Sequence, residues 1–269
     1  MDYFEITVQQ VSGEKREILV SLLADEGFES FMEEGEQLKA YIPSAGYSRE
    51  KVNRVCSLLD VTCSDRLIPD QNWNAEWERQ YEPVLIAGKC YIHAPFHPER
   101  PEFPYRLLIE PKMSFGTAHH ETTILMIEEM LDMEYHGKRI LDMGCGTGIL
   151  AILAAKMGAS EILAVDNDEW AFRNAAENCS RNEVKQVTVK QGDIQSAGTD
   201  YDIILANINR NTLLIHLPEY SKRMNKGELV MSGFYEEDLE AVRKIATING
   251  FRLTNHRIKN KWTVVRFTK

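Results

Sequence analysis

The first part of the chain shows apolar patterns typical of short strands and amphipathic helices. Alternating or short apolar runs predict strands, and apolar positions at helical spacing predict helices. The predicted elements are strands at 3–8, 28–33, 37–43 and 61–68 and helices at 13–26 and 48–59. Ser48 is the expected N-cap of the second helix. The order β-α-β-β-α-β is that of a small ferredoxin-like domain, and none of its residues indicates catalysis.

From residue 138 onward, strand and helix patterns alternate regularly. The predicted strands are 139–143, 161–166, 187–193, 202–207, 228–234, 251–259 and 262–267, and the predicted helices are 149–157, 169–181, 211–224 and 237–249. Such alternation is typical of an α/β fold with a largely parallel, doubly wound sheet. Only Asn260 and Lys261 separate the last two strands, which predicts an antiparallel hairpin at one edge.

Between these two parts, Trp73, Trp77 and Tyr81 lie four residues apart. This spacing predicts a short helix with one aromatic face. Packing on a neighbouring domain is the simpler interpretation, and a hinge helix that also touches substrate is the alternative. The expected organisation is a small domain at 1–68, a linker helix at 69–83 and a larger domain at 84–269.

Charge and cysteine content narrow the class of protein. The formal net charge is −10 and the pI is about 5.3, which disfavours free DNA or RNA as the principal partner and fits a small molecule or a basic protein better. Five cysteines without a CxxC pair indicate reduced thiols rather than disulfides or a zinc site. With no signal peptide pattern and no apolar stretch of spanning length, we expect a soluble cytoplasmic protein that neither enters nor contacts a membrane.

The strongest local motif is the glycine loop ILDMGCGTGIL at 140–150. A strand runs into Gly144, Gly146 and Gly148, and a helix follows. Glycines let a ligand approach the backbone, and the helix N-terminal amides point toward it. A dinucleotide fingerprint needs its third glycine where Ile149 stands. The spacing therefore disfavours NAD and favours a ligand without phosphates that lies flat on the loop.

Polar residues end the next three predicted strands, where ligands bind in open α/β sheets. Asp166 lies about twenty residues beyond the glycines, and an acid there can accept both ribose hydroxyls of an adenosine. A helix cap is the alternative, which Asp168 supplies equally well. Asp193 is placed to meet an adenine amino group, with a purely structural role equally favoured. Asn207 is placed to orient an incoming amine, although asparagine is also common in turns.

Together, these residues resemble the class I S-adenosylmethionine-dependent methyltransferases. The segment IEPKMSFGTAHHETT at 109–123 is similar to the DPGxAFGTGTHxTT segment of the bacterial methyltransferases that modify large-subunit ribosomal protein eleven. The resemblance covers nearly the whole chain. It implies S-adenosylmethionine as cofactor, with S-adenosylhomocysteine as product. It also implies that lysine ε-amines and an N-terminal α-amine of that ribosomal protein are the acceptors, and that the small domain grips the protein substrate.

The resemblance also implies particular site residues. Cofactor contacts fall on Thr123, Gly144, Asp166 and Asn207, to which the loop and strand-end positions add Gly146 and Asp193, and Asn207 is the expected catalytic residue. The chain departs from the family pattern at Lys112, Ala118, His119 and Glu121, which leaves the conformation of the 112–121 loop open. For His119 and His120 a solvated pair is favoured over a catalytic or metal-binding role, and no metal is expected.

Two other functions are the alternatives. Nucleic-acid amino-methyltransferases often have Asn-Pro-Pro-aromatic after the fourth strand, but here the run is Asn207-Ile208-Asn209-Arg210. A non-catalytic binding module is disfavoured because Gly144, Asp166 and Asn207 are all present. Residues 256–261 are basic, and a grazing contact with ribosomal RNA is a weaker expectation than a solvated hairpin. The sequence leaves open the methylated amines, the degree of methylation, the oligomeric state and whether free protein or ribosome is the substrate.

Overall fold

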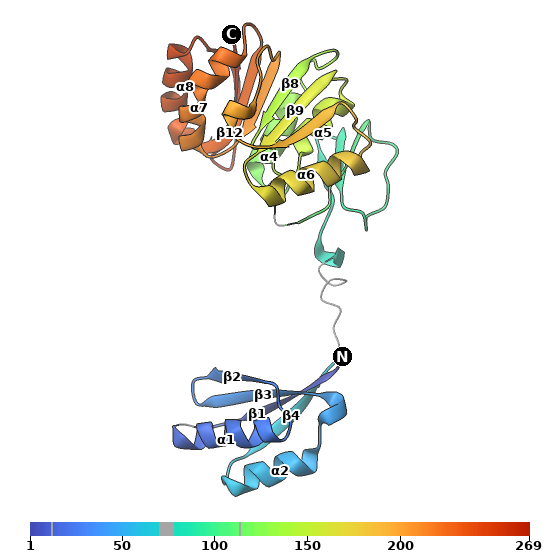
Figure 1. Ribbon diagram of the computed structural model, residues 1–269, viewed down its shortest axis with the longest axis vertical. Helices are drawn as coiled ribbons and strands as arrows, with labels where there is room; N and C mark the ends of the chain where they lie inside the picture. Colours follow the sequence, from blue (N-terminus) through green and yellow to red (C-terminus); the bar gives the residue numbers. More distant parts are fainter. Residues whose placement is uncertain (12, 70–77, 113) are drawn as a thin grey trace. The chain divides into compact units, whose positions relative to one another are not determined.

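The computed structural model describes residues 1–11, 13–69, 78–112 and 114–269 (Figure 1). Contacts between residues divide the chain into two compact units, Met1–Gln80 and Tyr81–Lys269. The predicted aromatic helix face falls largely outside the described residues, because Trp73 and Trp77 are not among them. Within the described ranges, no helix is both long and apolar enough to cross a bilayer.

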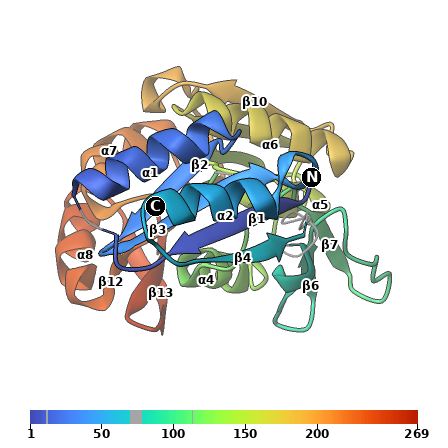
Figure 2. The same ribbon diagram turned by 90° about the horizontal axis from the view of Figure 1, so that it is seen from below.

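The first unit has the predicted order of strands and helices. Its elements are β1 (Tyr3–Val8), α1 (Glu14–Asp25), β2 (Ser30–Glu34), β3 (Gln37–Pro43), the short η1 (Ser44–Gly46), α2 (Arg49–Leu58) and β4 (Cys63–Ile68). Its antiparallel sheet has the order β2-β3-β1-β4, and α1 and α2 cover one face (Figure 2). Ser48 caps α2 as predicted, since its hydroxyl accepts from the Lys51 N–H at 3.5 Å.

The second unit is built around a seven-stranded sheet. Its strands are β8 (Arg139–Met143), β9 (Glu161–Asp166), β10 (Val187–Gln191), β11 (Ile203–Asn207), β12 (Glu228–Tyr235), β13 (Arg252–Lys259) and β14 (Trp262–Thr268). The order is β10-β9-β8-β11-β12-β14-β13; the first five strands are parallel, and β14 and β13 continue the sheet as an antiparallel hairpin. Asn260 and Lys261 have φ values of 48° and 69°, as a two-residue type I′ turn requires. The predicted edge hairpin is therefore confirmed.

Helices pack on both faces of this sheet (Figure 1). They are α4 (Glu121–Met130), α5 (Ile149–Lys156), α6 (Glu169–Arg181), α7 (Arg210–Arg223) and α8 (Leu239–Ile248), with short turns η2 (Ile194–Ser196) and η3 (Glu236–Asp238). Buried residues of α4, α5 and α6 share one core cluster, and those of α7 and α8 share another. The doubly wound sheet expected from the alternation of elements is therefore confirmed.

The region before β8 contains structure that the hydrophobic pattern did not predict. A second sheet of three short strands has the order β5-β6-β7, from β5 (Val84–Ile86), β6 (Cys90–His93) and β7 (Tyr105–Leu108). Strands of three or four residues are too short to show an alternation. The buried residues Ile92, Leu107 and Ile109 join the core that α4 and α5 form. This sheet therefore extends the larger unit.

Candidate active site

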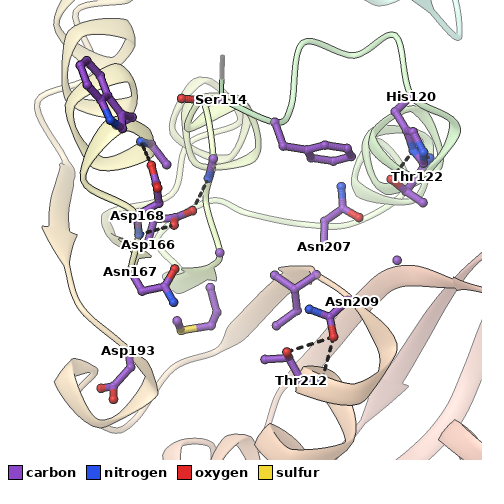
Figure 3. Close-up of a pocket in the computed structure, with 18 of the residues that line it drawn as sticks. Ser114, His120, Thr122, Asp166, Asn167, Asp168, Asp193, Asn207, Asn209 and Thr212 are labelled. Carbon is purple, nitrogen blue, oxygen red and sulfur yellow. Dashed lines mark hydrogen bonds between the residues drawn. The ribbon is translucent and has the colours of Figure 1, made fainter. Parts of the chain in front are cut away.

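A cavity of about 1140 Å³ opens at the carboxyl ends of β8, β9 and β11. Strand order reverses between β8 and β11, and such a switch point is where open α/β sheets bind ligands. In Figure 3, Asp166, Asn167 and Asp168 line one side of the cavity, and Asn207 lies across from them on the same side as His120 and Thr122. Small-molecule pockets are usually roughly 300–1,000 Å³. The cavity is therefore large enough for a cofactor together with part of a second substrate.

Packing within the protein, as well as the backbone conformation, requires the glycines of the loop after β8. Gly144, Gly146 and Gly148 all have positive φ values, of 74°, 55° and 79°. A Cβ on Gly144 would lie 2.2 Å from Cγ2 of Ile208, and one on Gly146 would lie 2.3 Å from the carbonyl oxygen of Phe115. The sequence predicted that these glycines let the backbone turn tightly and approach a ligand. The structure shows that neighbouring segments of the chain also occupy the space.

Asp166 holds the glycine loop in place at the end of β9. Its Oδ2 accepts from the Gly146 N–H at 2.9 Å, and its Oδ1 accepts from the Asp168 N–H at 3.0 Å. The helix cap that was the alternative role belongs to Asp168, whose Oδ1 accepts from the Ala171 N–H at 2.8 Å at the start of α6. Each Asp166 oxygen keeps accepting capacity on the cavity side, because a carboxylate oxygen accepts more than one hydrogen bond.

Asp193 lines the same cavity beyond the end of β10, as an exposed residue. Its Oδ1 accepts from the Gln195 N–H at 3.0 Å and caps η2. Another cavity residue, His216 of α7, is partly buried, and its Nδ1 lies 3.3 Å from the hydroxyl of Tyr220. Burial lowers the pKa of His216, so the imidazole is neutral at neutral pH.

Asn207 is the last residue of β11, and its carboxamide is fixed by a hydrogen bond to a residue that does not line the cavity. Its Nδ2 donates to Oγ1 of Thr123 at 3.4 Å. Thr123 on α4 is only 1% exposed and does not line the cavity, whereas the adjacent Thr122 does. Within the described part of the chain, no hydrogen bond to Oδ1 of Asn207 is formed. The structure thus places Thr123 behind Asn207, where it orients the carboxamide.

Aromatic side chains surround the Asn207 end of the cavity, and sequence reasoning assigned them no role. The ring of His120 lies edge-on to those of Phe115 and Trp262, at centroid distances of 5.2 and 4.8 Å. Trp262 in turn lies 4.2 Å from the ring of Tyr235. His120 also caps α4, because its Nδ1 accepts from the Thr122 N–H at 3.2 Å. The expectation of a solvated pair does not fit His120, which is partly buried and lines the cavity, and the exposed His119 has its Nε2 3.0 Å from the carbonyl of Glu82.

The loop before α4 is fixed to the glycine loop through Thr147. Its N–H donates to the carbonyl of Phe115 at 2.9 Å, and its hydroxyl donates to that of Gly116 at 2.6 Å. Ala118, which stands where the resembling family has glycine, is fully buried with φ 67°. Lys112 pairs with Glu177 at 2.5 Å across the exposed rim. Of the departures from the family pattern, Ala118 is thus a buried alanine at positive φ and Lys112 forms a surface ion pair.

A buried carboxyl group lies directly below the glycine loop. Asp142 of β8 is fully buried, and its Oδ2 accepts from the Ala151 N–H of α5 at 3.1 Å. Its Oδ1 has no partner among the described residues. Burial, with a smaller contribution from repulsion by Asp166, raises the pKa of Asp142 to about 7. The signal in the sequence is an acid inside the apolar run ILDM, a position that favours a buried carboxyl group.

Comparison with known proteins identifies the family. The family model described as ribosomal protein L11 methyltransferase matches residues 4–269. The chain belongs to this family. It is 44% identical over 264 residues to the ribosomal protein L11 methyltransferase of Porphyromonas gingivalis, covering 94% of this chain and 90% of that protein. It is 42% identical over 279 residues to that of Bacteroides fragilis, covering 99% of each.

A solved structure supports the fold. The ribosomal protein L11 methylase of Lactobacillus delbrueckii subsp. bulgaricus aligns with a TM-score of 0.65 at 24% sequence identity, over 70% of this chain and 98% of that one. The class I methyltransferase fold and the resemblance inferred from the FGT segment are therefore confirmed. In the described residues, no group of three or more His, Cys, Asp or Glu side chains is arranged to hold a metal ion.

Proposed function

We propose that this protein transfers methyl groups from S-adenosylmethionine to amino groups of ribosomal protein L11, in the cytoplasm. The observation that carries the proposal is the match to the L11 methyltransferase family over residues 4–269, in a chain whose strand ends place Asp166 and Asn207 in one cavity. Lysine ε-amines and the N-terminal α-amine are the acceptors we propose. A contact between residues 256–261 and ribosomal RNA stays a prediction.

The cavity fits the cofactor in shape and chemistry. Gly144 and Gly146 line the cavity, and Asp166 presents carboxylate oxygens beside them to accept ribose hydroxyls. Asp193 also lines the cavity, where we propose that it accepts the adenine amino group, and Asn207 closes the opposite end. When bound, S-adenosylmethionine supplies an electrophilic methyl group on a sulfonium centre. The residues of the chain supply orientation and exclusion of water.

The acceptor must reach the methyl group as a neutral amine. A free lysine has a pKa of about 10.4, and removal from water lowers the pKa of an amine. The Asn207 end of the cavity is lined by Phe115, Ile208 and Trp262, which offer little hydration to an ammonium. Oδ1 of Asn207 then accepts an N–H of the amine and directs its lone pair into the cavity. Nδ1 of His120 is already engaged by the Thr122 N–H, so we assign no strong general base.

Methyl transfer to purified substrates tests this function directly. The protein is incubated with isotopically labelled S-adenosylmethionine and either L11, another ribosomal protein or ribosomal RNA, and products are analysed by mass spectrometry. We expect label on amino groups of L11 and none on RNA. Label confined to RNA would favour the nucleic-acid alternative. Cofactor binding without any methylated product would favour a non-catalytic module.

Substitution of Asp166 is expected to weaken cofactor binding. Asp166→Ala removes the proposed ribose acceptors and also the anchor of the Gly146 N–H. Loss of charge-assisted hydrogen bonds worth roughly 1.5–3 kcal/mol corresponds to a rise in Kd of about ten- to a hundred-fold. Calorimetry with S-adenosylhomocysteine measures the change, and Asp200→Ala on the exposed β10–β11 connection is a matched control. Unchanged affinity in a folded Asp166→Ala protein would contradict the role.

The first unit is proposed to bind the protein substrate. Residues 1–69 contain 13 acidic and seven basic residues, a net charge of −6, and such a surface suits a basic partner protein. All the cavity residues belong to the second unit. A protein that begins at Tyr81 is therefore expected to bind S-adenosylhomocysteine normally but to lose at least about tenfold in kcat/KM for L11.

The isolated first unit makes this test sharper. Met1–Gln80 alone is expected to bind L11, and its affinity should fall as salt is raised because the attraction is between exposed charges. Full kcat/KM in the shortened protein would contradict the substrate-binding role. An aggregated protein without cofactor affinity would instead show that the first unit covers apolar surface of the second.

A further inference from the structure

The segment Asn207-Ile208-Asn209 carries the proposed acceptor-orienting carboxamide, and all three residues line the cavity. Hydrogen bonds hold its two ends. Asn207 donates to Thr123 at 3.4 Å, and Oδ1 of Asn209 accepts from the Thr212 N–H at 3.1 Å as the N-cap of α7. The side chain of Ile208 cannot form a hydrogen bond, so packing must hold the middle of the segment.

One side of Ile208 packs against the glycine loop. Cγ2 of Ile208 would lie only 2.2 Å from a Cβ on Gly144, so it occupies the place of the missing side chain. Gly144 has φ 74°, a conformation that other residues rarely adopt. The glycine loop therefore contacts Ile208 and also lines the proposed cofactor site.

The backbone of Ile208 packs against a bulge in the neighbouring strand. The register between β12 and β14 shifts between Ser232 and Phe234, and Gly233 lies at this shift with φ 106°. A Cβ on Gly233 would lie 2.0 Å from the carbonyl oxygen of Ile208 and 2.7 Å from its carbonyl carbon. These atoms belong to the backbone, so no side-chain rotation can relieve the overlap.

We propose that Ile208, packed between Gly144 and Gly233, is a positioning residue that fixes the Asn207 carboxamide for methyl transfer. The inference rests on the proposed function of this site. The carbonyl group that Gly233 contacts is one residue from Asn207, so a shift of Ile208 moves the carboxamide with it. A misplacement of about 1 Å in a reacting geometry can cost on the order of a hundred-fold in rate.

Gly233→Ala tests the packing of Gly233 against the Ile208 backbone directly. We expect kcat for L11 methylation to fall by about ten- to a hundred-fold, because the new Cβ displaces the Ile208 backbone. The Kd for S-adenosylhomocysteine should change by less than about threefold, because Asp166 and the glycine loop belong to other strands. If the bulge at Gly233 has only a structural role, the substitution should cause loss of folded protein, or equal losses in cofactor binding and turnover.

Gly137→Ala is the matched control. Gly137 also has a positive φ, of 72°, but a Cβ there would meet nothing within 4 Å. Both substitutions place an alanine at positive φ, and only Gly233→Ala adds the collision with Ile208. We therefore expect Gly137→Ala to lose some thermal stability but to keep the wild-type kcat.

A second pair of variants decides the question if Gly233→Ala does not fold. Ile208→Val keeps both Cγ atoms, including the one that meets Gly144, and should keep kcat within about threefold. Ile208→Ala removes them and should lose about tenfold in kcat with S-adenosylhomocysteine affinity retained. Equal kcat in the two Ile208 variants, or wild-type kcat in a folded Gly233→Ala protein, would overturn the inference. A wild-type protein that does not methylate L11 would instead overturn the proposed function.

Discussion

Asn207→Ala is expected to lower kcat for L11 methylation by about a hundred-fold while leaving the Kd for S-adenosylhomocysteine within about threefold of wild type. The carboxamide is oriented by Thr123 and leaves Oδ1 for the acceptor amine. An interaction that aims a lone pair acts mainly in the transition state, so its loss appears in kcat. Single-turnover kinetics with labelled cofactor and purified L11, beside calorimetry on the same samples, measure both quantities.

A matched substitution separates this effect from a general loss of amide groups. Asn225→Ala makes the same chemical change at an exposed position outside the cavity, where the side chain donates to Asp200 at 2.8 Å. This control should keep the wild-type kcat. If Asn207→Ala also turns over at the wild-type rate, the orienting role of the carboxamide is wrong. If it loses cofactor affinity as much as kcat, Asn207 acts in cofactor binding instead.

The alternating sheet of the second unit could be predicted closely from the sequence, because its signals are local. The strand Glu161–Asp166 and the helix Glu169–Arg181 have the predicted bounds. In both elements, the spacing of the apolar residues and the polar residues at the ends indicate the same bounds. Asp168 caps the helix at its first turn. Where an element ends in an irregular connection the prediction extended too far, as at 187–193, where β10 ends at Gln191.

The sheet β5–β7 and helix α4 could not be predicted in this way. The three strands have four residues or fewer, and they acquire their pairing from partners up to 15 residues away. In α4, apolar residues occupy four consecutive positions from Ile124 to Ile127, so the helix shows no single apolar stripe. Tertiary burial, rather than periodicity, determines the structure of both.

Of the residues in the candidate site, those at the ends of parallel strands could be predicted from the sequence. The rule that ligands bind at the carboxyl ends of parallel strands points to Asp166 and Asn207, and both line the cavity. His120 and Trp262 reach the same cavity from segments more than a hundred residues apart, which no local pattern relates. Gly233 had a weak signal, since an isolated glycine inside a strand pattern often marks a bulge. Its contact with Ile208 depends on the neighbouring strand.

The buried Asp142 makes the stability of the fold depend on pH. The pKa of this carboxyl is about 7 in the folded protein and 3.8 without burial, so between these values the folded state holds a proton that the unfolded state has lost. Stability contributed by Asp142 is therefore complete below pH 4 and is lost as pH rises to about 7. The shift of roughly three units corresponds to ~4 kcal/mol as an upper bound.

Asp142→Asn is expected to remove this dependence. The amide oxygen still accepts from the Ala151 N–H, and the side chain no longer titrates. The free energy of unfolding, measured by urea denaturation from pH 4 to pH 8, should fall for the wild type relative to the variant by roughly 2–4 kcal/mol as pH rises. Asp202→Asn is the matched control, because Asp202 also accepts a backbone N–H, from Arg139 at 2.8 Å, but is partly exposed. This control leaves Asp142 in place, so its free energy of unfolding should still fall as pH rises. If the Asp142→Asn profile is parallel to that of the wild type, Asp142 is ionised in the folded protein throughout this range, and the α5 N-terminus and the Ala151 N–H must then stabilise its charge.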